Sequence, residues 1–318
     1  GLGDVYKRQV PLGKVMVQSV DYFRAFIDDP FQFGAIAANH ALGDVYAMGA
    51  EPQSVLAIAT VPYGREKIVE ETLYEVLAGA IKMLEPTGAV LVGGHSAEGA
   101  ELAFGLTVNG LVDPNNVWRK QGLKAGDSLI LTKPIGTGTL FAADMRRKAK
   151  GRWIAQAIQT MLHSNQQAAH CLQKYQATSC TDVTGFGLVG HLVEMTRASD
   201  VDAEIFIQQL PVLDGARDTV EAGILSSLQP QNIRLRRAIQ NIDQASKHAD
   251  YPLLFDPQTA GGLLAGVPAE NEQASAATAL WPWLLAAALA LFVADVALRR
   301  LDMSNVFGTE LHRGELRY

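Results

Sequence analysis

The chain has 318 residues, enough for two domains of ordinary size that each bury their own core. With 48% hydrophobic residues, 19% charged residues and a net charge of −6, it is typical of a soluble globular protein and has no basic footprint for nucleic acid. An anionic ligand would therefore have to be bound by the backbone amides of a glycine-rich segment or by a metal ion. Two cysteines, Cys171 and Cys180, exclude a disulfide framework and favour a reducing cytoplasm.

Residues 1–13 are interpreted as a non-native leader. They have neither the apolar core nor the cleavage site of a signal peptide. Residues 4–9 look like the translation of a sequencing adapter, so the leader is left out of the fold prediction.

The segment Leu280–Leu298 is apolar, with Asp295 as its single charge, and it is about as long as a bilayer-spanning helix. Two tryptophans near its start and two arginines behind it fit a membrane span. Arginines on the C-terminal side would hold the short tail in the cytoplasm. The residues before the segment would then lie across the membrane, where no ATP is available. Three interpretations stay open: a chimeric join near residues 274–280, a membrane anchor followed by the tail 299–318, or a buried terminal helix.

Short apolar runs alternate with helical periodicity between the two ends, which predicts a mixed helix-and-strand architecture. In residues 14–113, a helix is expected to open at Pro30 and another to cover Glu66–Leu84. Strands are expected at Val15–Val20, Ser54–Val61, Ala89–Val92 and Leu102–Val112. The polar stretch Asp113–Asp127 is the predicted boundary between the domains.

A second domain is expected over residues 114–274. Its predicted strands are Ser128–Thr132 and Ala203–Ile207, and the apolar run Leu263–Val267 follows later. Its predicted helices are Gly136–Met145, Trp153–Tyr175 and a third one that ends near Arg197, after a glycine-punctuated loop over Thr181–Gly190.

Two aspartates are the first candidate site residues. Asp44 falls on the apolar face of the helix that opens at Pro30, where an unpaired carboxylate is costly and indicates a partner or a metal. A salt bridge or a helix cap is the alternative for this residue taken alone. Asp21 is predicted at a strand end, beside which ligands bind in α/β folds.

Two glycine-rich segments are the candidates for binding phosphate. Gly93, Gly94 and His95 follow a predicted strand, and successive amides in a glycine turn can cradle phosphate oxygens. The segment Thr181–His191 combines a carboxylate, hydroxyls and glycines before a helix, so Asp182 could supply an oxygen ligand to Mg²⁺. An ordinary glycine-rich turn is the alternative in each case. The sequence offers His40 and His191 no role beyond packing.

Together these segments resemble selenophosphate synthetase (selenide, water dikinase), a family with an aminoimidazole ribonucleotide synthetase-like fold. The resemblance covers residues 14–274. The motifs that carry it are Asp21–Phe23, Asp29–Gly34, Ala41–Gly49, Gly93–Ser96, Thr181–His191 and Asp256–Leu264.

The resemblance implies a two-domain α+β subunit that dimerises through its N-terminal sheet and binds ATP in a cleft. The implied reaction converts selenide, ATP and water to selenophosphate, AMP and orthophosphate. Carried over by motif, Asp44 and Asp182 are the expected Mg²⁺ ligands. Asp44, Asp21, Gly93, Gly94 and His95 are the expected ATP contacts.

The family also carries a cysteine or selenocysteine and a nearby lysine in an N-terminal glycine-rich segment, which residues 1–13 do not match. No catalytic residue is therefore assigned, and the chain as written is expected to have an incomplete reaction centre. Two alternatives remain. One is another ATP-using enzyme of the same superfold, such as thiamine-monophosphate kinase or a hydrogenase-maturation protein, and the other is a nucleotide-binding module that is catalytically dead or membrane-anchored.

Overall fold

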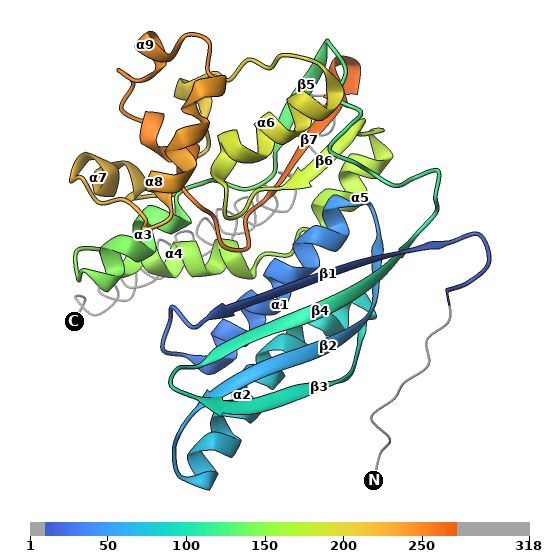
Figure 1. Cartoon of the computed structure of the whole chain (residues 1–318), viewed down its shortest axis with the longest axis vertical. Coiled ribbons are helices and arrows are strands. Elements are labelled where there is room, and N and C mark those ends of the chain that lie inside the picture. The colour runs from blue at the N-terminus through green and yellow to red at the C-terminus, as the bar shows by residue number, and fades with distance from the viewer. Residues whose placement is uncertain (1–9, 272–318) are drawn as a thin grey trace, which may run out of the picture. The chain divides into compact units, whose positions relative to one another are not determined.

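The computed structural model describes residues 10–271, and the mixture of helices and strands expected from the sequence is confirmed (Figure 1). The first sheet has the strand order β1-β4-β2-β3. Its strands are β1 (Val15–Arg24), β2 (Glu51–Pro62), β3 (Val90–Gly99) and β4 (Ala103–Val112). Strand β4 is antiparallel to both β1 and β2, whereas β3 runs parallel to β2.

Helix α1 (Pro30–Ala47) lies at the centre of the fold. It contacts the first sheet, helix α2 (Glu66–Leu84) and several elements of the second half of the chain. Asp29 caps its start by accepting a hydrogen bond from Gln32 N at 2.9 Å, and Pro30 occupies the first helical position, where its missing N–H costs nothing. Most of the residues of α1 are buried, so the helix packs against neighbours on nearly all sides.

The second sheet has the order β5-β7-β6, and both pairings are antiparallel. Its strands are β5 (Asp127–Leu131), β6 (Ser179–Asp182) and β7 (Leu263–Pro268). The helices of this half are α3 (Thr137–Met145), α4 (Gly151–Leu162), α5 (Gln166–Lys174), α6 (Gly187–Ser199), α7 (Ala216–Glu221), α8 (Gln229–Asn232) and α9 (Ile242–Ala245). Short 3₁₀ turns occur at Glu85–Thr87, Ile207–Gln209, Ile233–Ala238, Tyr251–Phe255 and Ala269–Asn271.

Two strands of the first sheet are longer than expected. Strand β1 continues to Arg24, so Asp21 lies within it and is paired with Leu106 of β4 rather than standing at a strand end. Strand β3 continues to Gly99 through the segment expected to be a glycine turn. In both cases backbone pairing with the neighbouring strand extends the strand through polar and glycine residues.

The helix expected over Trp153–Tyr175 is divided into α4 and α5. Tertiary hydrogen bonds stabilise the break, because Asn39 Nδ2 donates to Met161 O at 2.6 Å and to His163 O at 2.8 Å. Asn165 Nδ2 also donates to Gly261 O at 2.9 Å. Carbonyls that a continuous helix would use internally are thus satisfied by side chains from elsewhere.

The strand expected at Ala203–Ile207 is wrong. Residues 201–206 have no regular structure, and in the described part of the chain no strand pairs with them. Without a neighbouring strand the backbone cannot form a ladder, although Ile205 and Ile207 still pack against the hydrophobic core of the second half of the chain.

The apolar segment 280–298 lies outside the described residues. Within residues 10–271, no helix combines the length and the apolar character that crossing a membrane requires.

Candidate functional site

Three carboxylates converge where the two halves of the chain meet at α1. Asp21 comes from β1, Asp44 from the last turns of α1 and Asp182 from the end of β6. Ser19 Oγ donates a short hydrogen bond to Asp44 Oδ2, and a Cβ placed on the adjacent Gly43 would lie 3.8 Å from Asp182 Oδ2. The alternation along β1 puts Asp21 on the helix-covered face of the sheet. The acidic cluster Asp21, Asp44 and Asp182 is therefore assembled from three separate segments.

The electrostatics of the acidic cluster favour a cationic ligand. Burial, followed by the charge of Asp44, raises the pKa of Asp21 to about 6. Burial is also the main reason that the pKa of Asp182 rises to about 7, and Asp44 and Asp21 add to it. Removal from water and mutual repulsion both disfavour the ionised forms, and a bound cation would reverse both effects.

His40 lies beside the acidic cluster, although only a packing role was expected for it. Its Nε2 is 3.7 Å from Asp21 Oδ1, and its Nδ1 accepts a hydrogen bond from Ala260 N at 2.9 Å. Burial lowers the pKa of His40 to about 4. The carbonyl oxygen of Ala260 accepts a hydrogen bond from Lys133 Nζ at 2.9 Å. Burial lowers the pKa of Lys133 to about 7.

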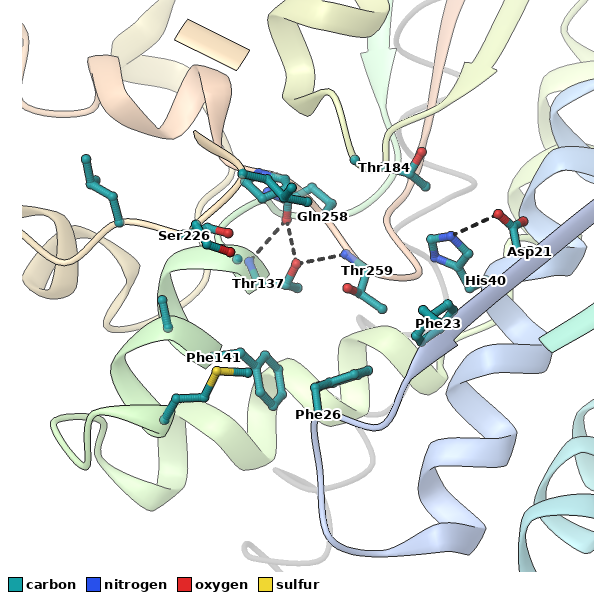
Figure 2. A pocket seen from close by; sticks show the side chains of 18 of the residues that line it. Asp21, Phe23, Phe26, His40, Thr137, Phe141, Thr184, Ser226, Gln258 and Thr259 are labelled. Atoms are coloured by element: carbon teal, nitrogen blue, oxygen red, sulfur yellow. Dashed lines mark hydrogen bonds and ion pairs between the residues drawn. The ribbon is translucent and has the colours of Figure 1, made fainter. Parts of the chain in front are cut away.

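A cavity of about 560 Å³ opens next to Asp21 and His40 (Figure 2). Three aromatic rings, those of Phe23, Phe26 and Phe141, form its apolar side, and the last two are in edge contact at 4.9 Å between ring centroids. Its polar side includes Thr137, Thr184, Ser226, Gln258 and Thr259. The volume is in the range of pockets that hold small organic ligands.

The loop 256–262 holds the start of α3 against this cavity. Gln258 Oε1 accepts from Gly136 N and Thr137 N at 2.9 and 3.1 Å, and Asp256 Oδ2 accepts from Gly138 N at 3.0 Å. These bonds occupy the amides that would otherwise be open at the helix N-terminus. The start of α3 is consequently a structural contact with the loop 256–262 rather than an anion-binding site.

Gly93, Gly94 and His95 do not form the expected phosphate-binding turn. They lie in β3, where a register shift marks a bulge and where a Cβ on Gly94 would come within 2.0 Å of Ala57 O. The glycines therefore permit close approach of two strands. Strand β3 and the β1 strand that bears Asp21 are opposite edges of the sheet, about 14 Å apart, so one chain does not bring the two groups together.

Neither cysteine is placed as a nucleophile. Both side chains are buried, and burial raises the pKa of the Cys180 thiol. A thiol acts as a nucleophile in its ionised form, so Cys180 is a buried structural thiol rather than a nucleophile.

His40 and Lys133 are the neighbours of the acidic cluster that sequence reasoning missed. His40 stands four residues before Asp44, a spacing that puts both on one side of a helix, so this signal was present. Lys133 follows a short apolar strand, and nothing in its local sequence indicates burial. His191 Nε2 accepts from Thr184 N at 3.1 Å and holds the turn after Asp182.

Comparison with known proteins decides the family. The N-terminal domain of AIR synthase related proteins matches residues 5–112, and the C-terminal domain matches residues 124–283. The selenide, water dikinase of Clostridioides difficile is 38% identical over 255 residues, which cover 80% of this chain and 72% of the relative. The chain belongs to the selenide, water dikinase family.

A second member of this family, from Nitratidesulfovibrio vulgaris strain DP4, is 38% identical over 82% of this chain and 74% of its own length. Solved structures that share the fold are more distant in sequence. Thiamine-monophosphate kinase from Stenotrophomonas maltophilia has a TM-score of 0.62 at 18% identity, with 84% of this chain and 78% of that chain covered. The hydrogenase maturation protein HypE of E. coli has a TM-score of 0.63 at 19% identity, with 86% and 78% covered. The AIR synthase-like fold expected from the resemblance is confirmed.

Proposed function

We propose that this chain binds ATP with Mg²⁺ at the acidic cluster and serves the synthesis of selenophosphate. In that reaction selenide, ATP and water give selenophosphate, AMP and orthophosphate. The observation that carries the proposal is the convergence of Asp21, Asp44 and Asp182 from three elements beside a pocket, in a chain of the selenide, water dikinase family. We further propose a cytoplasmic location, where ATP is available.

The donor set suits Mg²⁺. In residues 10–271 no group of three or more His, Cys, Asp or Glu side chains could hold a metal ion unaided. Mg²⁺ commonly uses one or two carboxylates together with substrate phosphates and water, so Asp44 and Asp182 are proposed as its protein ligands. When bound, the ion would neutralise phosphate charge, while Asp21 would contact ATP or its metal ions.

Relatives support the nucleotide. One structure of HypE is a complex with ATP, and it shares the fold with a TM-score of 0.65 at 16% identity. A thiamine-monophosphate kinase structure with AMPPCP has a TM-score of 0.60 at 20% identity. The sequence relatives from Clostridioides difficile and Nitratidesulfovibrio vulgaris are named selenide, water dikinase, which favours that reaction over the kinase and maturation alternatives. No observation in the described residues favours a dead or membrane-anchored module.

We also propose that the chain is a homodimer joined through the open face of the first sheet. Helices cover one face, whereas the other exposes apolar side chains that the strand register aligns in rows. Val20 and Leu56 flank Thr107 in one row, and Tyr22 and Ile58 flank Gly105 in the next. A second copy on this face could also bring its Gly93, Gly94 and His95 toward the acidic cluster, which one chain cannot do alone.

The test measures AMPPCP binding in the presence of Mg²⁺ by calorimetry. Asp182→Asn should weaken binding about tenfold or more, because it removes a proposed metal ligand. Asp214→Asn, a substitution of an exposed aspartate outside the acidic cluster and the cavity lining, is the control and should bind like the unaltered chain. Phosphorus NMR then follows ATP turnover with selenide. Equal binding by both variants would remove Asp182 from the site, and no binding by the unaltered chain would refute the nucleotide proposal.

A further inference from the structure

A buried lysine stands behind the acidic cluster. Lys133 lies two residues after the end of β5 and is only 4% exposed, yet in the described part of the chain no carboxylate pairs with it. Its Nζ donates to Ala260 O at 2.9 Å. Burying an amine with one neutral acceptor is costly, so a shorter apolar side chain would be more favourable for packing alone.

Ala260 transmits this contact to His40. Its φ of +46° lies in the left-handed region, which alanine seldom adopts, so the surrounding contacts must hold the peptide there. The Ala260 N–H donates to His40 Nδ1 at 2.9 Å. An accepting Nδ1 carries a lone pair, and the ring proton therefore resides on Nε2.

The Nε2–H of His40 points toward Asp21, as the dashed line in Figure 2 shows. The ring is also held from the side, since it meets Phe23 edge-on at 5.2 Å between centroids. At 3.7 Å from Asp21 Oδ1, Nε2 is beyond hydrogen-bond length, and such contacts commonly tighten when a ligand binds. Lys133, Ala260, His40 and Asp21 thus form a continuous series of contacts that ends at the acidic cluster and at the cavity.

We propose that Lys133 is a positioning residue of the nucleotide site, which acts by holding the Ala260 backbone so that His40 presents Nε2–H to Asp21. The proposal rests on the proposed function, because it treats Asp21 as a contact of ATP or its metal. A purely structural role, in which Lys133 only satisfies the Ala260 carbonyl, would affect stability and leave the histidine unchanged.

Two variants of Lys133 separate these roles. Lys133→Met keeps an apolar chain of similar length but removes the donor, whereas Lys133→Gln keeps a neutral donor for Ala260 O. Nitrogen-15 NMR of the histidine rings reads the tautomer of His40 directly, and His40→Phe assigns its signals. We expect the Nε2–H form in the unaltered chain and in Lys133→Gln, and a mixture of tautomers in Lys133→Met.

Binding of AMPPCP with Mg²⁺ is the second readout. Lys133→Met should weaken it about tenfold, the usual effect of losing a residue that orients a ligand of a site, and Lys133→Gln should restore most of the affinity. Thr219→Val is the control, because it removes a buried hydroxyl contact with Thr139 at 2.9 Å, and neither residue belongs to the contact series or to the cavity lining. It should lower stability and leave both readouts unchanged.

A double substitution keeps the test decisive if Lys133→Met is poorly folded. His40→Phe should lose affinity by itself, and adding Lys133→Met should cost little more, since both act through one contact series. An Nδ1–H tautomer in the unaltered chain would overturn the proposal, as would unchanged spectra and affinity in Lys133→Met. Absence of AMPPCP binding in the unaltered chain would refute the proposed function instead, and the tautomer would still test the contact series.

Discussion

Asp256 shows how the residues around the cavity are held. The side chain is fully buried, and its Oδ2 accepts hydrogen bonds from Gly138 N and Gln258 Nε2, both at 3.0 Å. Burial outweighs these bonds and raises the pKa of Asp256 to about 7. The carboxyl therefore keeps its proton in the folded chain at pH values where the unfolded chain has lost it.

This shift predicts a pH-dependent stability. Between the unfolded pKa near 3.8 and the folded pKa of about 7, Asp256 binds a proton in the folded chain but not in the unfolded chain. Its contribution to the stability of the fold is therefore greatest at low pH and is lost as the pH rises through 7. Asp256→Asn keeps an oxygen acceptor and cannot ionise. Relative to the unaltered chain, it should gain stability between pH 4 and pH 7, by up to about 4 kcal/mol. Urea unfolding across this range measures the difference, and parallel stability curves would contradict it.

Single residues of the site differ in how far the local sequence reveals them. Asp44 and Asp182 stood out because a carboxylate on an apolar helix face, or beside glycines before a helix, conflicts with its local pattern. Lys133 gave no such conflict, since only the tertiary fold places the loop 256–262 over it. Residues that act through a distant loop cannot be found from local spacing.

At the scale of elements, local signals predicted the helices best. The amphipathic pattern over Glu66–Leu84 matches α2 at both ends, and Pro30 opens α1 as expected. The predicted strands ended too early, at Asp21 and Gly93, because the true ends of β1 and β3 depend on pairing with β4 and β2. Side chains from other segments likewise set the break between α4 and α5.

Helices α1 and α2 pack at backbone contact, which gives an element-scale prediction. A Cβ on Gly79 would lie 1.9 Å from Phe31 O, and a Cβ on Gly34 would lie 1.9 Å from Val76 O. Gly79→Ala must push the helices apart and should destabilise the fold by about 1–3 kcal/mol. Gly151→Ala is the control, since its Cβ meets nothing within 4 Å, and alanine there should be neutral or slightly stabilising. Equal urea midpoints for the two variants would mean that the interface can relax.

At the scale of the whole molecule, the first sheet has one covered face and one open face. Tyr22 and Ile58 are 46% and 38% exposed on the open face, although strands of a stable sheet usually bury such side chains. The width of the sheet also separates the two sets of residues that the family motifs assign to one nucleotide, because β1 and β3 are opposite edges. A second copy that covers the open face would bury its apolar side chains and would bring the two sets of residues together.

Ile58→Glu tests this arrangement. A charge in the centre of the open face should convert the dimer to a monomer in sedimentation velocity, because burying an unpaired carboxylate is unfavourable. The monomer should also bind AMPPCP with Mg²⁺ about tenfold more weakly, if the partner's glycine strand completes the site. Ile68→Glu places the same charge at an exposed position on α2 and should change neither property. A monomeric unaltered chain would refute the dimer, and a monomeric variant with full affinity would show that each chain binds the nucleotide alone.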